Sequence, residues 1–174
     1  MKKILKGAAV LAVLAAVSAA PAQAQAKIGA AGTGLFSLEE GGGSDFGGMV
    51  LVGFGGTTSP IGFRVDGTYI SANGASNIMA TGNVVYGFKT AETSMFHPYL
   101  LAGGGITRFE FLDESEIKPM AKAGAGFDYM IGTGGNLGLF GEATFNLSFL
   151  GDDFGGTSKA LQANVGVKYA LGGN

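Results

Sequence analysis

Apolar and polar residues alternate along the last full segment of the chain. From Leu161 to Leu171 every odd position is apolar, and the even positions include Gln162, Asn164 and Lys168. A period of two places successive side chains on opposite faces of a β-strand, which a helix cannot do. A strand of about 9–11 residues with one apolar and one polar face is long enough to cross a bilayer within a closed barrel. The segment therefore predicts a membrane-spanning β-strand.

Seven further segments of similar length precede this one. The eight predicted strands cover residues 27–39, 47–57, 61–71, 77–89, 97–109, 118–130, 136–149 and 159–171. The first, second and fifth are so rich in glycine and alanine that neither face can be assigned, which leaves their register open. Polar connections follow the odd-numbered strands. The pattern predicts an all-β fold, an eight-stranded antiparallel, up-and-down transmembrane β-barrel with both termini in the periplasm.

The N-terminus has the three parts of a secretion signal. Lys2, Lys3 and Lys6 precede an apolar run over residues 7–20, and small residues before Ala24 and Ala26 offer two cleavage sites. The run is shorter than the roughly 20 apolar residues of a membrane-spanning helix. We expect residues 1–26 to be a cleaved signal peptide and residues 27–174 to be one outer-membrane β-barrel domain, with the choice between the two sites open.

Composition narrows the possible functions. The formal charge of −2 becomes −5 once the three signal lysines are removed, so the chain has no electrostatic reason to bind nucleic acid. It contains no cysteine and one histidine, His97, and we expect no metal site, cofactor or catalytic residue. Glycine is abundant, with 33 residues, as the tight curvature of a small barrel requires.

The polar faces of the predicted strands carry a balanced set of charges. They are Arg64, Asp66, Lys122, Asp128, Glu142 and Lys168. An Arg or Lys facing lipid near the bilayer midplane costs about 2–4 kcal/mol, whereas a charge inside the barrel can be paired. The interior of an eight-stranded barrel is only wide enough for side chains to fill it. We therefore expect an ion-paired, side-chain-filled lumen, with Glu142 and Lys168 as one pair; a narrow pore is the alternative.

The C-terminal strand also carries a motif, Asn164-x-Gly166-x-x-Tyr169-x-Leu171. It resembles the C-terminal signal of bacterial outer-membrane barrels, although Gly172-Gly173-Asn174 follow where that family often ends on the aromatic. Residues 97–106 (HPYLLAGGGI) and 123–129 (AGAGFDY) are similar to strands of the outer-membrane β-barrel domain family. The resemblance implies location in the outer membrane of a Gram-negative-type bacterium and recognition by the barrel-assembly machinery during insertion.

Three functional hypotheses remain open. The first is a non-enzymatic outer-membrane protein with a role in envelope integrity or surface interaction, a monomer whose partners are the outer-membrane lipids. The second is a small pore or transport protein. The third is a lipid-modifying enzyme, which is less favoured because His97 lies at the predicted periplasmic start of its strand.

Overall fold

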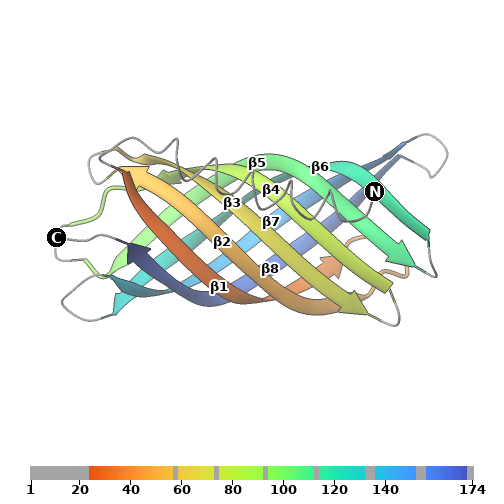
Figure 1. Ribbon diagram of the computed structural model, residues 1–174, viewed down its shortest axis with the longest axis horizontal. Coiled ribbons are helices and arrows are strands. Elements are labelled where there is room, and N and C mark those ends of the chain that lie inside the picture. The colour runs from red at the N-terminus through yellow and green to blue at the C-terminus, as the bar shows by residue number, and fades with distance from the viewer. Residues whose placement is uncertain are drawn as a thin grey trace.

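The computed structural model describes residues 24–56, 59–72, 75–91, 94–111, 114–131, 136–151 and 156–171. The chain forms a closed barrel in which each strand pairs antiparallel with the next and β1 pairs with β8 (Figure 1). The strands are β1 (Ala24–Ser37), β2 (Ser44–Gly56), β3 (Ile61–Ala72), β4 (Ala75–Gly87), β5 (Phe96–Phe111), β6 (Glu114–Ile131), β7 (Leu137–Gly151) and β8 (Gly156–Leu171). The predicted eight-stranded antiparallel barrel is confirmed.

The two ends of the barrel differ in what they carry. The first strand begins and the last strand ends at the same end, since Ala26 lies opposite Leu171. We call this the terminal end; β2–β3, β4–β5 and β6–β7 are connected there. The hairpins β1–β2, β3–β4, β5–β6 and β7–β8 turn at the other end, which we call the hairpin end. The sequence-based prediction that both termini lie in the periplasm would place the hairpin end on the outer side of the membrane.

Several strands run further toward the hairpin end than the alternation predicts. Residues 110–117 were expected to form a loop, but β5 continues to Phe111 and β6 begins at Glu114. Polar side chains such as these suit the part of a barrel sheet that extends beyond the hydrocarbon region into water. They do not mark the end of the strands, because backbone pairing continues wherever both strands extend.

Most of the predicted signal peptide, residues 1–23, lies outside the described residues. Ala24 to Ala26 form the first residues of β1 and pair with Gly56, Gly55 and Phe54. Among the described residues, no helix is long and apolar enough to span a membrane.

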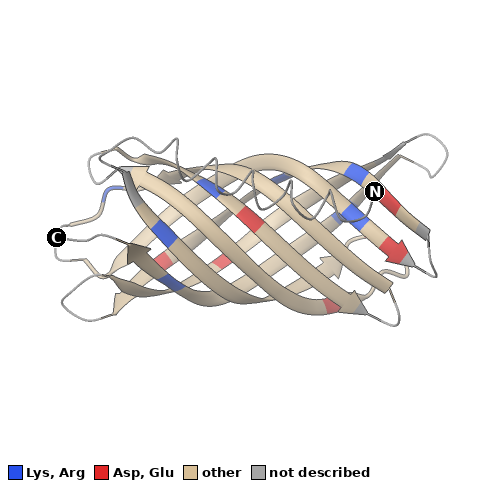
Figure 2. Cartoon of the chain, in the orientation of Figure 1, with Lys and Arg blue, Asp and Glu red and all other residues tan. Residues whose placement is uncertain are grey.

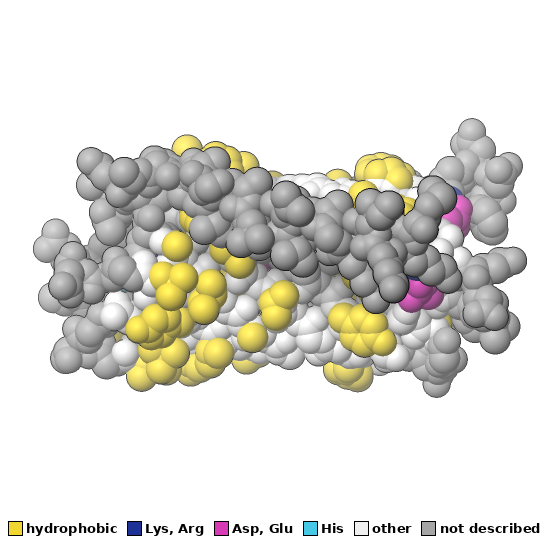
Figure 3. Space-filling view, in the orientation of Figure 1, with side chains coloured by type: hydrophobic (Ala, Val, Ile, Leu, Met, Phe, Trp, Pro, Cys, Tyr) yellow, Lys and Arg dark blue, Asp and Glu magenta, His cyan; other side chains and the backbone are white. Residues whose placement is uncertain are grey.

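The outer face of the barrel is apolar along its strands (Figure 3). On β8, Val165 is 72% exposed, whereas its neighbour Asn164 is 1% exposed. The same alternation assigns the strands whose faces the sequence left open: Ile28 on β1, Val50 on β2 and Leu100 on β5 point outward. A closed sheet with an apolar exterior pairs its strand backbones and leaves no free edge in the hydrocarbon.

Glycines at inward positions allow the sheet to curl. At the five most crowded of them, an added Cβ would overlap a carbonyl oxygen of the adjacent strand: Gly47, Gly103, Gly105, Gly124 and Gly166. A small barrel must bend its strands sharply to close, and the inner side of each bend has the least room. The high glycine content is therefore a requirement of closure.

The lipid-facing assignment predicts a depth-dependent effect of charge. Val165→Arg places a guanidinium near the middle of the exposed face of β8, between Lys159 and Leu171. We expect it to destabilise the inserted barrel by about 2–4 kcal/mol. The measurement is urea unfolding in lipid vesicles, followed by the gel-mobility difference between folded and boiled protein.

Thr157→Arg is the matched control for this substitution. Thr157 lies on the same face of β8 but at the hairpin end, where a lipid-facing charge costs only about 0–1 kcal/mol. Gln162 is unsuitable as a control, because it is buried and hydrogen-bonded to three lumen residues. Equal losses for the two arginine variants would contradict the assignment of the lipid face.

Candidate functional site

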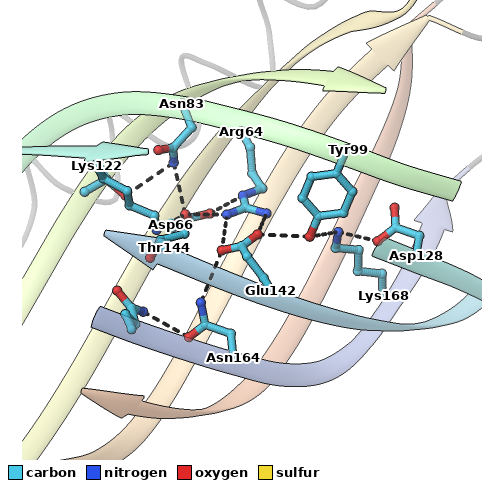
Figure 4. Close-up of polar contacts among 12 residues, drawn as sticks. Arg64, Asp66, Asn83, Tyr99, Lys122, Asp128, Glu142, Thr144, Asn164 and Lys168 are labelled. Atoms are coloured by element: carbon cyan, nitrogen blue, oxygen red, sulfur yellow. Dashed lines mark hydrogen bonds and ion pairs between the residues drawn. The ribbon is translucent and has the colours of Figure 1, made fainter. Parts of the chain in front are cut away.

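A cluster of charged side chains crosses the middle of the lumen (Figure 4). Figure 2 marks where the charged residues stand along the strands. Arg64, Asp66, Lys122 and Glu142 are each at most 6% exposed. They come from β3, β6 and β7, because the period of two turns these positions inward. Together with the amide, hydroxyl and phenol groups that they contact, they form what we call the lumen plug.

Arg64 is the central cation of the plug. It donates to both carboxylate oxygens of Glu142, over 2.6 and 2.9 Å, so that β3 is joined to β7 across the lumen. Its Nε also lies 2.7 Å from Asp66 Oδ1 on its own strand. A planar guanidinium is suited to such paired contacts, which fix orientation as well as charge.

Asp66 accepts hydrogen bonds from residues on three strands. Its Oδ2 accepts from Lys122 Nζ at 2.8 Å, from Asn83 Nδ2 at 3.0 Å and from Arg64 Nη2 at 2.9 Å. Two cations thus face two anions in the buried set of Arg64, Lys122, Asp66 and Glu142. This balance matters because an unpaired charge in a dry interior is costly.

Glu142 has a further set of neutral donors. Tyr99 donates its hydroxyl to Oε2 over 2.9 Å, and Asn164 donates its amide to Oε1 over 3.2 Å. The tyrosine lies close against Gly126, where an added Cβ would come within 2.6 Å of its hydroxyl. The glycine on β6 therefore leaves the space that lets Tyr99 reach Glu142.

Lys168 pairs with a different acid from the one expected. Its Nζ lies 2.6 Å from Asp128 Oδ1, whereas the sequence suggested Glu142. Lys168 is opposite Gly138 on β7, and Glu142 is opposite Asn164, so the two residues of the expected pair lie at different levels of the barrel. The ammonium also lies over the rings of Tyr99 and Phe140, 4.6 and 4.4 Å from their centroids.

Amide and hydroxyl groups continue the plug toward the hairpin end. Asn146 donates to Gln162 over 2.8 Å, and Gln162 donates to Asn164 over 2.9 Å and to Thr33 over 3.1 Å. Sequence analysis missed Thr33 and Tyr99 because they lie on strands whose faces were unassigned. For Asn83 and Gln162 the sequence did offer a signal, because the alternation on β4 and β8 places both residues on the inward face of their strands.

Among the described residues, every strand except β2 contributes a side chain to the plug, and at the level of the plug the inward side chains of β2 are Met49 and Leu51. Met49 and Leu51 of β2 pack with Phe140 on one side of the charged groups. Ile70, Met79 and Met120 form a second buried apolar cluster. Polar and apolar side chains together fill the middle of the lumen.

Two hollows lie on either side of the plug. The terminal vestibule, at the terminal end, has a volume of about 610 Å³ and is bordered by Arg64, Tyr99 and Lys168. The hairpin vestibule, at the other end, has a volume of about 420 Å³ and is bordered by Ile70, Met79 and Asn146. The two vestibules share no lining residue.

Groups suited to catalysis or metal binding are scarce in the described part of the chain. His97 Nδ1 lies 2.9 Å from Thr90 Oγ1 at the terminal end, and Asp128, opposite it on β6, is paired with Lys168. No set of three or more histidine and carboxylate side chains among the described residues is arranged to hold a metal ion.

The four residues of the C-terminal motif have separate structural environments. Asn164 belongs to the plug, and Gly166 occupies a position where the sheet leaves no room for a Cβ. Tyr169 and Leu171 are exposed on the outer face, near the terminal end. Gly172 to Asn174 lie outside the described residues. Recognition by the assembly machinery remains a prediction from the motif.

The closed barrel, its apolar exterior and its filled polar lumen define a class. The protein has the fold of the small eight-stranded β-barrels of the bacterial outer membrane. No family model matches the chain, and no curated protein matches it.

Solved structures are similar in fold. Neisserial surface protein A has a TM-score of 0.66 and 17% identity, over 86% of this chain and 98% of that one. The outer membrane protein OprG from Pseudomonas aeruginosa has a TM-score of 0.62 and 12% identity, over 86% and 97%. The outer membrane enzyme PagL has a TM-score of 0.53 and 16% identity, over 83% and 99%. Identities this low indicate a shared fold, and the fold does not fix the activity.

Proposed function

We propose that the protein is a non-enzymatic, monomeric structural component of the outer membrane whose lumen is closed by the plug. The observation that carries this proposal is the buried, charge-balanced network of Arg64, Asp66, Lys122 and Glu142. Its contacts cross the lumen between strands that are not neighbours in the sheet. Such cross-links brace a small barrel and obstruct the passage of ions.

The absence of a shared lining between the two vestibules supports a closed lumen. An ion entering from either end meets side chains that are at most 6% exposed and already paired. To pass, it would have to separate Arg64 from Glu142, and breaking a buried pair is costly. The alternative of a small pore would require this network to open.

The short hairpins favour a role in envelope integrity over binding of a protein at the surface. β3 ends at Ala72 and β4 begins at Ala75, while β5 ends at Phe111 and β6 begins at Glu114. A standard protein interface buries about 800 Å² on each partner. Connections of this length supply little of that area unless several hairpins act together.

A catalytic role has less support from the contacts of the described residues. The hydrogen-bond partner of His97 is a threonine, and Glu142 and Asp128 are both engaged in ion pairs. The fold itself is compatible with catalysis, because PagL is described as an outer membrane enzyme. A change in the lipid A mass spectrum that depends on the protein would contradict the non-enzymatic part of the proposal.

Conductance in planar lipid bilayers tests the closed lumen. We expect the wild-type barrel to give no sustained current, because the four buried charges of the plug are paired with one another. The double variant Arg64→Ala/Glu142→Ala removes one cation and one anion, so the charge balance remains while the obstruction is lost. We expect this variant to conduct.

A matched double variant separates loss of the plug from loss of any ion pair. Arg108→Ala/Glu110→Ala removes the same kinds of group from the rim, where both side chains are more than a third exposed. We expect it to remain closed. Sustained current through the wild-type protein would reject the structural role and favour the pore.

A further inference from the structure

The lining of the terminal vestibule carries positive charge that is not paired within the plug. Lys27, Lys89 and Lys168 border it, and Asp128 is the single carboxylate among the described residues that line it. Asp128 is paired with Lys168. Lys27 and Lys89 have no hydrogen-bond or ion-pair partner among the described residues. Among its described Lys, Arg, Asp and Glu residues, and leaving aside Arg64, which is paired within the plug, the lining therefore has an excess of two positive charges.

Arg64, at the floor of this vestibule, adds nothing to the excess. Its charge and that of Lys122 are balanced by Asp66 and Glu142 within the plug. The opposite end has a different character, because Asp45 and Glu110 border the hairpin vestibule. The positive excess is thus a property of the terminal end.

Glycines make the room in the terminal vestibule. Gly53, Gly55 and Gly87 stand on its walls, and a Cβ at any of them would meet nothing closer than 3.6 Å. These glycines differ from Gly105 or Gly166, which the curl of the sheet requires. Space that side chains could fill is left open in a hollow that Lys27 and Lys89 border.

The walls also offer apolar surface and hydroxyl groups. Leu51, Val85 and Phe88 supply the apolar surface, and Ser59 and Thr90 supply the hydroxyl groups. Ligand sites in proteins typically enclose about 300–1,000 Å³ and combine an apolar lining with a few convergent polar groups. The volume of about 610 Å³ is within that range.

From these features we infer that the terminal vestibule binds a phosphate monoester with an apolar organic part. The dianion matches the two excess charges, and ammonium groups bind phosphate as point charges. The apolar part would lie along Leu51 and Val85. Because the plug closes the floor, the ligand would be held at one membrane face without being transported. A water-soluble ester and a lipid with a phosphate monoester headgroup share this chemistry.

Backbone amide shifts in the NMR spectrum of the mature protein in detergent test the site, with phenyl phosphate as the probe. We expect saturable shifts at Lys27, Gly53, Gly55 and Lys168. Inorganic phosphate should bind more weakly, since it lacks the apolar part, and phenol should leave these amides unchanged.

Two variants test separately whether the charge of Lys27 and the free space of the vestibule are needed for binding. Lys27→Gln should weaken binding of phenyl phosphate by about tenfold or more, the expected effect of losing a hydrogen bond to a charged group. Gly55→Leu fills the vestibule without altering charge and should reduce binding to a similar or greater extent. Lys159→Gln, which removes an exposed lysine at the hairpin end, should leave the affinity unchanged.

Competition identifies the source of the phosphate group. If phosphatidic acid in the same micelles displaces phenyl phosphate, the lipid headgroup occupies the site; if it does not, the site takes a soluble ester. The inference would be overturned by absent saturable shifts, by equal affinity of wild-type and Lys27→Gln proteins, or by shifts confined to the hairpin end. A Gly55→Leu barrel that failed to fold would leave the Lys27→Gln comparison decisive.

Discussion

Replacing Gly105 by alanine should strongly destabilise the barrel or prevent its closure. The added Cβ would overlap the carbonyl oxygen of Ala80 and lie 2.8 Å from Thr81 Cα, both backbone atoms of β4. Backbone in a paired sheet cannot move aside without breaking its ladder. We expect a loss of about 3 kcal/mol, the upper part of the usual range for overpacking. Urea unfolding in lipid vesicles, read from gel mobility, measures it.

Gly82→Ala is the matched control, on the adjacent strand. Gly82 points outward and a Cβ there meets no atom within 4 Å. Since glycine in a strand interior is less stable than alanine by roughly 0.5–1 kcal/mol, this change should be neutral or stabilising. If Gly105→Ala were as stable as Gly82→Ala, the curl of the sheet would not be the reason for the inward glycines.

Replacing Glu142 by alanine should also have a large effect. The change removes the acceptor of two hydrogen bonds from Arg64, one from Tyr99 and one from Asn164. It also leaves two buried cations with one buried anion. Breaking a buried pair on one side typically costs about 3–5 kcal/mol, and we expect a loss in that range from the same unfolding assay.

Two comparisons show whether charge imbalance is the cause. Glu110→Ala removes a glutamate that contacts Arg108 and Ser76 at the rim, where it is 41% exposed, and should cost at most about 1 kcal/mol. The double variant Arg64→Met/Glu142→Leu restores balance with apolar groups and should be more stable than Glu142→Ala. A double variant less stable than the single one would mean that the hydrogen bonds matter more than the balance.

The number and approximate positions of the strands were largely predictable, because the alternation of apolar and polar residues that marks a strand is a local property of the sequence. On β3 and β7 the alternation of Ile61, Phe63 and Val65, or of Leu137 and Leu139, gives the outward face without any knowledge of the neighbouring strands. The same reasoning failed on β1, β2 and β5, where glycine and alanine occupy both faces. There, only pairing with flanking strands fixes which side is buried.

The members of the lumen site were predictable, but not their partners. The alternation of apolar and polar residues placed six charged residues on the lumen side of their strands: Arg64, Asp66, Lys122, Asp128, Glu142 and Lys168. It gave no information on the height of each side chain along the barrel, so adjacency of strands suggested Glu142 for Lys168. The observed partner, Asp128, lies two strands away on β6.

By itself, the sequence determined that the chain exposes apolar side chains outward and charged ones inward, because a period of two is a property of each strand alone. The tertiary structure decided which cation meets which anion, and where the lumen is filled or hollow. Those outcomes depend on the stagger between strands in the closed sheet, which brings Arg64 on β3 to Glu142 on β7 across 78 residues of chain. Pairing of β8 with β1 closes the sheet, and in the closed barrel β3 and β7 face each other across the lumen.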